Sequence, residues 1–362
     1  MQTFECQCGH ILFFRNTRCL RCGRRVGFSP DAGAMTALEP GADGVWHVPD
    51  AGRVRGRGFR RCRNDVAYDI CNWLLPADSD GDLCRACRLN RTIPDLAEPR
   101  HITLWYRLET AKRHLLYTLY RLELPVIGRD RDPEAGLAFD FLADSDAATE
   151  FTRPLDDGNP VSTGHLNGLI TINIAEADDV ARTRIREQLG ESYRTLIGHF
   201  RHEIGHYYWS LLVAGGEWLA SFRDLFGDER ADYAAALRTH YEQGPRRGWE
   251  DRYISAYAAC HPWEDWAECW AHYLHIVDTL DTAREFGFTR PVPWHRDPDG
   301  FDRMMREWST LTVGINAVNR SMGLSDAYPF AINRPTWDKL AFIHRLIRRH
   351  ATQAGTPLRT TA

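Results

Sequence analysis

Residues 198–209 of the chain read Gly198-His199-Phe200-Arg201-His202-Glu203-Ile204-Gly205-His206-Tyr207-Tyr208-Trp209. It contains the pattern H-E-x-x-H at His202, Glu203 and His206. Residues four apart lie on one face of a helix, so the two imidazoles point the same way. A tetrahedral zinc ion accepts two such nitrogens, and the glutamate after the first histidine can reach a water molecule on the metal. The pattern therefore predicts a helix that carries part of a zinc site.

The residues around this motif favour a helix. Apolar or aromatic side chains recur with a period of about 3.6 residues, and no proline interrupts residues 161–244. The recurring positions are Leu189, Tyr193, Leu196, Ile197, Phe200, Ile204, Tyr207 and Tyr208. The alternative interpretation is a buried helix that carries two histidines by chance. A third metal ligand elsewhere in the chain has to decide between the two.

A second predicted helix supplies that ligand. Pro262 suits a first helical turn, and Glu264, Glu268, His272 and His275 then fall on one face. Acids and histidines on a tryptophan-rich helix are costly to bury without a partner, and a metal ion is such a partner. We predict Glu264 as the third ligand and Glu268 as the acceptor that fixes the tautomer of a ligand histidine. The alternative is a solvated polar face.

The composition limits the class of protein. The chain has 362 residues, 43% of them hydrophobic and 26% charged, with a net charge of -4. This near-neutral balance does not indicate a nucleic-acid or membrane partner. No apolar run is long enough to span a membrane, and the N-terminus lacks the pattern of a signal peptide. We therefore expect a cytoplasmic protein with no membrane partner.

The chain contains ten cysteines, and in the reducing cytoplasm they are not expected to form disulfides. Their paired spacing favours thiolates on metal over disulfides. The first set follows a zinc-ribbon pattern of two knuckles around one tetrahedral site, with the ligands Cys6, Cys8, Cys19 and Cys22. Because its first knuckle is C-x-C, one residue shorter than usual, His10 is a possible substitute ligand.

A second set predicts a second structural zinc, at Cys62, Cys71, Cys84 and Cys87. Residues 72–75 lie between the pairs and are expected to pack one ribbon on the other.

Residues 29–52 are rich in Pro, Gly, Ala and Asp and indicate a loop or linker. The basic run 53–63 is either a contact for nucleic acid or a solvated loop in an arginine-rich protein, and we favour the loop.

Beyond a boundary near residues 93–96, the pattern predicts a second domain over residues 96–362, after a zinc-ribbon region over 1–95. Helices are expected at 101–123, 300–322 and 335–350, and strands at 136–142 and 164–174. The last strand would form a sheet edge beside the metal, where an extended peptide could add as a further strand. The residues predicted to bind substrate there are Leu169, Ile170, Thr171, Ile172 and Asn173.

The two metal-binding runs resemble the bacterial putative zinc-binding metallopeptidases, which carry an N-terminal zinc-ribbon region. Cys6-Gln7-Cys8-Gly9 with Phe13-Phe14-Arg15-Asn16 is similar to that ribbon, so the resemblance covers most of the chain. It implies a zincin-like peptidase of the gluzincin kind that acts on a peptide or protein. The fold it implies is α+β, a mainly helical domain with a small mixed sheet after a small zinc-ribbon module. We therefore expect one catalytic zinc ion at the His-His-Glu set and two structural zinc ions at the two cysteine sets.

The E-x-x-A-E arrangement at residues 264–268 also resembles the glutamate helix of the lethal-factor-like zincins. In those enzymes the first glutamate binds zinc, and a tyrosine two turns upstream stabilises the oxyanion. Tyr257 is the matching position here, and its competitors are Tyr253, Tyr207 and His272.

The predicted reaction is amide hydrolysis by water on the zinc, with Glu203 as general base. One rival hypothesis is a catalytically inert zinc-ribbon protein that binds nucleic acid. Another is a protein-binding scaffold held by structural zinc ions. The sequence names neither a substrate nor an oligomeric state.

Overall fold

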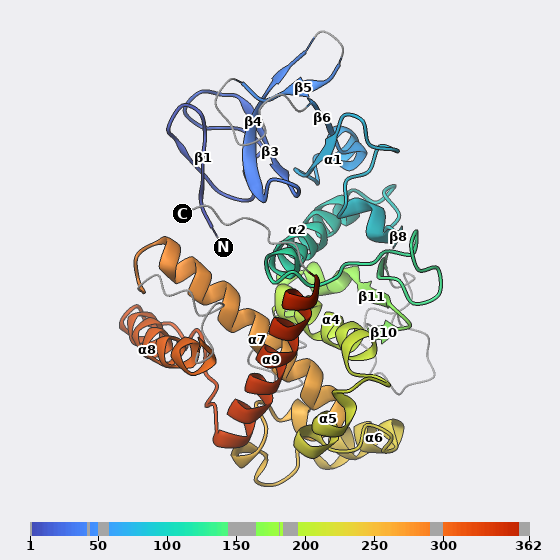
Figure 1. Cartoon of the computed structure of the whole chain (residues 1–362), viewed down its shortest axis with the longest axis vertical. Helices are drawn as coiled ribbons and strands as arrows, with labels where there is room; N and C mark the ends of the chain where they lie inside the picture. The colour runs from blue at the N-terminus through green and yellow to red at the C-terminus, as the bar shows by residue number, and fades with distance from the viewer. Residues whose placement is uncertain are drawn as a thin grey trace.

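We describe the fold from a computed structural model. The described residues are 2–41, 44–49, 58–143, 164–180, 182–183, 195–289 and 300–354. The N-terminal strands lie at one end of the molecule and the long helices at the other (Figure 1). Leu189, Tyr193 and residues 53–57, which the sequence analysis uses, lie outside the described ranges.

The N-terminal region is built from two antiparallel sheets. A two-stranded sheet pairs β1 (Phe4–Glu5) with β2 (Ile11–Leu12). A five-stranded sheet follows in chain order: β3 (Arg25–Ser29), β4 (Ala34–Pro40), β5 (Trp46–His47), β6 (Gly58–Arg61) and β7 (Leu74–Pro76). The expected loop over 29–52 is therefore wrong where β4 and β5 form. The apolar run at 34–38 within this Pro- and Gly-rich stretch pairs with β3 and is mostly buried.

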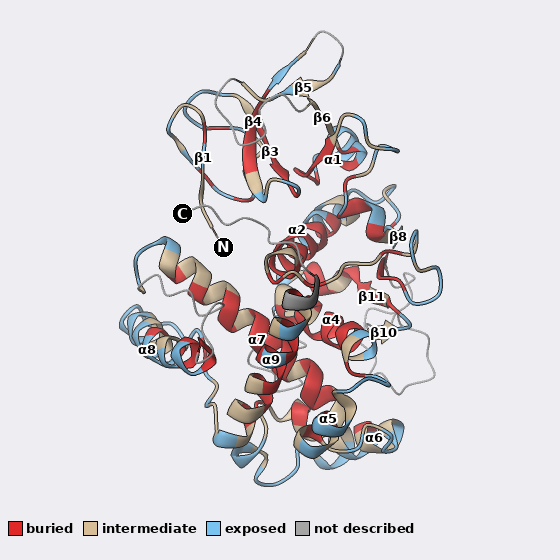
Figure 2. Cartoon of the chain, in the orientation of Figure 1, coloured by how far each residue is buried: buried red, intermediate tan, exposed pale blue. Residues whose placement is uncertain are grey.

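Helix α2 (Pro99–Arg121) joins the two regions. On one side, Tyr117 packs its ring 5.1 Å from the ring of Phe14 and 5.7 Å from that of Phe28. On the other side, α2 contacts α4 (Leu196–Leu212). Buried residues of both regions form one continuous hydrophobic core. The N-terminal region is thus packed on the helical region through α2 (Figure 2).

The helical region contains a four-stranded mixed sheet in the order β10-β11-β9-β8. Its strands are β8 (Asn90–Thr92), β9 (Ala138–Leu142), β10 (Gly164–Leu166) and β11 (Leu169–Asn173). β8 and β11 are parallel to β9, whereas β10 is antiparallel to β11. Since β8 precedes residue 95 and pairs with β9, the sheet crosses the predicted boundary, which stays a prediction.

The expected single strand at 164–174 is a hairpin. Asn167 and Gly168 form its two-residue turn with φ of 45° and 77°, as Asn-Gly turns do. As a result β10 covers Leu169, Ile170 and Thr171, and these three residues pair with β9 on their other side. Their predicted place at a sheet edge is therefore wrong. In the described part of the sheet, the edge beside them is β10.

Further helices lie in both regions, the first of them in the N-terminal region and the others in the helical region. They are α1 (Arg63–Tyr68), α5 (Leu219–Phe226), α6 (Tyr233–Gln243), α7 (Pro262–Glu285), α8 (Gly300–Ser321) and α9 (Arg334–Ala354). Short 3-10 turns lie at η1 (Cys87–Leu89), η2 (Ile174–Ala177), η3 (Trp249–Asp251) and η4 (Tyr257–Ala259). The prediction of a mainly helical α+β fold with a small mixed sheet is confirmed. Among the described helices, none has the length and apolar character needed to cross a membrane.

The crossing of α4 and α7 positions the site. Gly205 lets the two helices approach closely, because a Cβ atom there would lie 3.1 Å from the Cα atom of Ala267. Trp266 donates a hydrogen bond from Nε1 to the carbonyl oxygen of Gly205 at 2.8 Å. The contact is buried on both helices (Figure 2). It sets the second turn of α7 against the middle of α4.

Candidate metal centre

Two helices carry the predicted metal ligands, α4 with His202 and His206 near its middle and α7 with Glu264 in its first turn. α4 begins after Thr195, whose side chain accepts a hydrogen bond from the Gly198 amide at 3.0 Å. α7 begins at Pro262 after His261, whose Nδ1 accepts from the Trp263 amide at 3.1 Å. Both contacts satisfy amides that a helix N-terminus leaves open. They fix the direction of each helix at the site.

The three predicted ligands converge. The ligand atoms of His202, His206 and Glu264 all lie within 4.8 Å of one another, and all three residues are buried. Oε2 of Glu264 is 2.9 Å from Nε2 of His202 and 3.7 Å from Nε2 of His206. Two histidines and one carboxylate are a donor set of catalytic zinc sites.

Two predicted ligands are also held by hydrogen bonds at the atoms that face away from the metal position. Nδ1 of His202 lies 2.8 Å from Oε1 of Glu268, whose Oε2 accepts from the Ser255 hydroxyl at 2.6 Å. The Tyr233 hydroxyl donates to Oε1 of Glu264 at 2.6 Å. Nε2 of His202 and Oε2 of Glu264 therefore face each other at the position where a metal ion would bind both. With its Nδ1 proton given to Glu268, a neutral His202 would offer the lone pair of Nε2 to such an ion, so the residues fit zinc.

The charges of the site agree with this fit. Burial disfavours the ionised form of Glu264, but the two histidines outweigh it and lower its pKa to about 2. Burial also opposes a charge on His202, yet Glu264 and Glu268 raise its pKa well above the usual value. The cluster therefore has a carboxylate that is ionised at neutral pH and surroundings that favour a positive charge.

Glu203 lies on the same helix but outside the ligand group. Its Oε1 is 3.3 Å from Nε2 of His199, one helical turn earlier. Burial raises the pKa of Glu203, but the contact with His199 and the nearby His202 outweigh burial and lower it. Glu203 is therefore ionised at neutral pH, as a general base must be.

Tyr257 and its competitors differ in their surroundings. The ring of Tyr257 lies 5.9 Å from that of His202, and burial raises the pKa of its hydroxyl. His272 instead places Nδ1 2.8 Å from the Tyr328 hydroxyl. Tyr253 lies under Lys339, with Nζ 4.4 Å from the ring centre. Tyr207 packs on Tyr208, with ring centres 5.1 Å apart.

Tyr233 is a site residue that the sequence analysis missed. It starts α6, 31 residues before Glu264, and only the tertiary fold joins the two. No local spacing signals this contact. His199 was also missed, although its i,i+4 relation to Glu203 could have indicated it. In the loop at 326–330, Tyr328 is buried against His272 and Trp308.

The sheet edge beside the centre is β10. His165 on β10 packs its ring 6.3 Å from that of His206, nearly parallel to it. Ile172 and Asn173 of β11 have no partner in β10, and on the other side of β11 they pair with β9. Of the sheet strands described, β10 is thus the one that places an edge near a metal ligand.

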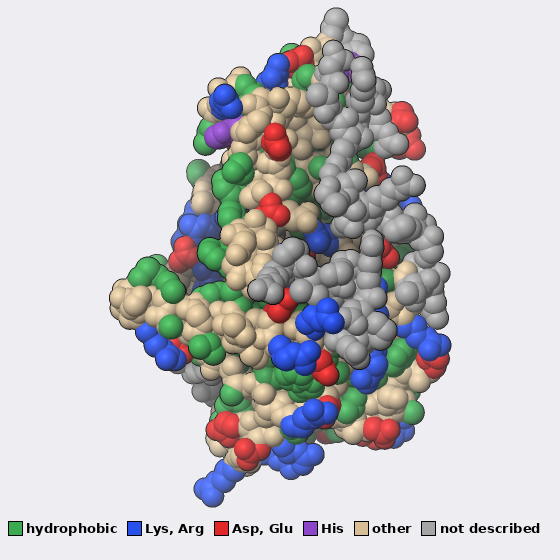
Figure 3. All heavy atoms as spheres, turned by 60° about the vertical axis from the view of Figure 1, so that its left-hand side comes forward, with side chains coloured by type: hydrophobic (Ala, Val, Ile, Leu, Met, Phe, Trp, Pro, Cys, Tyr) green, Lys and Arg blue, Asp and Glu red, His purple; other side chains and the backbone are tan. Residues whose placement is uncertain are grey.

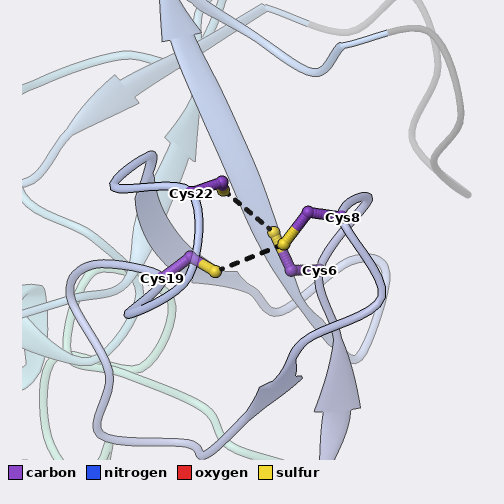
Figure 4. Close-up of side chains that lie close together, drawn as sticks. All are labelled: Cys6, Cys8, Cys19 and Cys22. Atoms are coloured by element: carbon purple, nitrogen blue, oxygen red, sulfur yellow. Dashed lines mark hydrogen bonds between the residues drawn. The ribbon is translucent and has the colours of Figure 1, made fainter.

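Two groups of four thiols lie in the N-terminal region. In the first, Sγ of Cys6 is 3.7 Å from that of Cys22, and Sγ of Cys8 is 3.6 Å from that of Cys19 (Figure 4). The four side chains point toward one another from two knuckles, and His10 is not part of the group. All ten cysteines are free thiols.

The second group joins Cys62, Cys71, Cys84 and Cys87, all of them buried. The amide of Cys84 donates to Sγ of Cys62 at 3.4 Å. Between the groups, Asn72 donates from Nδ2 to the carbonyl oxygen of Phe14 at 2.7 Å. Residues 72–75 thus pack one cysteine group on the other, as predicted.

In the described part of the basic run, residues 58–63, the arginine side chains already have partners in the protein. Nε of Arg61 is 2.7 Å from Asp65, and Nη1 of Arg63 is 3.3 Å from Asp82. On the face drawn in Figure 3, basic and acidic side chains are interspersed. These pairings weaken the case for a nucleic-acid surface within residues 58–63.

Comparison with known proteins decides the family. The family described as putative zinc-binding metallopeptidase matches residues 101–346, which include every residue of the candidate centre. The chain belongs to this family. A zinc-ribbon domain matches residues 3–98, which include both groups of four thiols.

Relatives of this metallopeptidase-family protein occur in mycobacteria. Uncharacterized proteins of Mycobacterium bovis and Mycobacterium tuberculosis are 41% identical to it over 356 residues. The match covers 96% of this chain and 95% of each relative. No solved structure was found to match. The family name and the cysteine groups support zinc as the metal.

Proposed function

We propose that the protein is a zinc-dependent peptidase that hydrolyses peptide bonds in a peptide or protein substrate. The proposal rests on the buried group of His202, His206 and Glu264, with Glu203 next to His202 on the same helix. Three protein ligands leave a tetrahedral zinc one position for water, which is the arrangement of catalytic zinc sites. The two thiol groups offer four ligands each, which is the arrangement of structural sites.

Each residue has one role in this proposal. A zinc ion held by the two histidines and Glu264 supplies a Lewis acid and lowers the pKa of water toward 7. Glu203 takes the proton of the attacking water and passes it to the leaving amine. The hydroxyl of Tyr257 donates to the developing oxyanion. Glu268 and Tyr233 hold His202 and Glu264 in place through the hydrogen bonds described above.

The substrate backbone pairs with β10 in this proposal. Strand addition needs an unpaired strand edge, and β10 borders the described sheet next to His206. This moves the role first given to residues 169–173 onto the neighbouring strand. The side-chain preference on either side of the cleaved bond is not specified by these contacts.

The experiment is chelation followed by zinc addition. Purified protein is incubated with an unfolded protein substrate, and new amino termini are identified by mass spectrometry. New termini should appear with the untreated protein, vanish after mild chelation and return with zinc. A zinc-loaded protein that produces no new termini from a broad set of unfolded substrates would count against the proposal. It would favour the inert, partner-binding alternative.

A further inference from the structure

His199 lies between two buried carboxylates. Its Nε2 is 3.3 Å from Oε1 of Glu203, and its Nδ1 is 3.6 Å from Oε2 of Glu176. The exposed fractions of the three side chains are 14% for His199, 7% for Glu203 and 3% for Glu176. The imidazole therefore lies between the predicted general base and a second, more deeply buried acid, and its 3.6 Å contact with Glu176 is electrostatic rather than a hydrogen bond.

The fold holds Glu176 firmly in this position. β11 ends at Asn173, whose side chain accepts a hydrogen bond from the Ala175 amide at 2.9 Å and starts the turn η2. Arg107 of α2 donates from Nη1 to the carbonyl oxygen of Ala177 at 2.8 Å. Glu176 thus stands on a short turn between the central sheet and α2.

We propose that His199, supported by Glu176, is a positioning residue that holds the carboxylate of Glu203 in the orientation needed to take a proton. The inference rests on the proposed peptidase function. A glutamate side chain has several rotatable bonds, and ordering it costs conformational entropy at the moment of reaction. A contact that occupies Oε1 fixes the carboxylate and leaves Oε2 for the water molecule.

The size of the effect follows from the geometry of proton transfer. A general base has to lie within about 2.6–3.2 Å of the group whose proton it takes. A misplacement of about 1 Å in an active site can lower the rate about 100-fold. His199 is separate from the metal ligands, since the ligand group contains only His202, His206 and Glu264. Its loss should therefore lower kcat and leave zinc binding unchanged.

The test compares His199→Ala, His199→Gln and Glu176→Gln. The alanine variant should lower kcat about 100-fold with KM nearly unchanged and zinc content equal to wild type. The glutamine side chain can place an amide N–H near Glu203, so His199→Gln should recover most of the loss. His344→Gln is the matched control, because His344 is a buried histidine on α9 that contacts the Tyr273 hydroxyl at 2.9 Å. It should keep wild-type kcat even if its melting temperature falls.

A double variant separates positioning from a structural role. If His199 acts through Glu203, adding His199→Ala to Glu203→Gln should lower the residual rate no further. The inference would be overturned if His199→Ala lowered kcat by the same factor in wild type and in Glu203→Gln. It would also be overturned if both His199→Ala and Glu176→Gln kept wild-type kcat. A fall in melting temperature with unchanged kcat would also overturn it.

Crystal structures of zinc-loaded wild type and His199→Gln and His199→Ala variants keep the two proposals distinguishable. The Glu203 carboxylate should face residue 199 in wild type and the glutamine variant, and turn away in the alanine variant. That result supports the inference even if no substrate is hydrolysed, in which case only the peptidase proposal fails. If the protein hydrolyses peptides and the Glu203 carboxylate does not move in the alanine variant, the peptidase proposal stands and the proposed role of His199 is refuted.

Discussion

Glu268 lies 2.8 Å from Nδ1 of His202, on the side of the ring away from Glu264. The two glutamates, one helical turn apart on α7, thus contact the two nitrogens of one imidazole. Glu264 also lies 3.7 Å from His206, whereas Glu268 is held by Ser255 at 2.6 Å. We therefore propose Glu264 as the metal ligand and Glu268 as the residue that orients His202.

The first prediction compares Glu264→Ala with Glu268→Ala. Removing the ligand Glu264 should abolish tight binding at the catalytic site. Removing Glu268 should weaken zinc binding by about 10–100-fold and leave a measurable site. Zinc is titrated after mild chelation, so that the thiol-bound ions stay in place. The assignment is reversed if Glu268→Ala empties the site while Glu264→Ala only weakens it.

The second prediction separates two tyrosines. Tyr233→Phe removes the hydrogen bond to Oε1 of Glu264, so zinc affinity should fall by about 10–100-fold. Tyr257→Phe should keep zinc affinity and lower kcat by about 100–1,000-fold, because an oxyanion donor acts only in the transition state. Zinc titration and peptide hydrolysis are measured on both variants. Loss of kcat at full zinc affinity in Tyr233→Phe would move the oxyanion role to Tyr233.

The third prediction concerns the number and order of zinc ions. Two thiol groups and one His-His-Glu group imply three zinc ions per chain. Cys62, Cys71, Cys84 and Cys87 are buried, whereas Cys22 is exposed. The catalytic ion has three protein ligands against four thiols in each other group, so chelation should release it first, and the ion of the fully buried second thiol group last. Elemental analysis with thiol titration measures this, and about one zinc per chain with all thiols reactive would contradict it.

The fourth prediction concerns stability. Nζ of Lys339 on α9 lies 2.6 Å from Oδ2 of Asp265, and the exposed fractions of the two side chains are 5% and 0%. Lys339→Ala removes the cation beside Asp265, so it should lower the free energy of unfolding by up to about 3–5 kcal/mol. The loss should be smaller where the pH is low enough to protonate Asp265, because burial already raises the pKa of this carboxyl to about 7. Denaturant unfolding measures the loss. Arg230→Ala removes an exposed pair with Asp228 and serves as the control, which should unfold like wild type.

Local spacing was enough to predict the metal-binding helices. The H-E-x-x-H turn and the glutamates of α7 are periodic along single helices, and α2, α8 and α9 follow the same apolar periodicity. The Asn-Gly turn at 167–168 was also readable, and it was passed over because the flanking apolar residues look like one strand. Tyr233 and Glu176 could not be predicted, because they reach the site from α6 and η2 through tertiary packing.

Glu203→Gln removes the proposed general base and should abolish peptide hydrolysis without loss of zinc. The change keeps the size of the side chain and removes the base, while the ligand group of His202, His206 and Glu264 stays intact. The variant and wild type are chelated, reloaded with zinc and assayed side by side on the same peptides. We predict equal zinc occupancy in both proteins and a loss of hydrolysis of at least about 100-fold in Glu203→Gln. Equal hydrolysis by the two zinc-loaded proteins, or loss of zinc from the variant, would contradict the account.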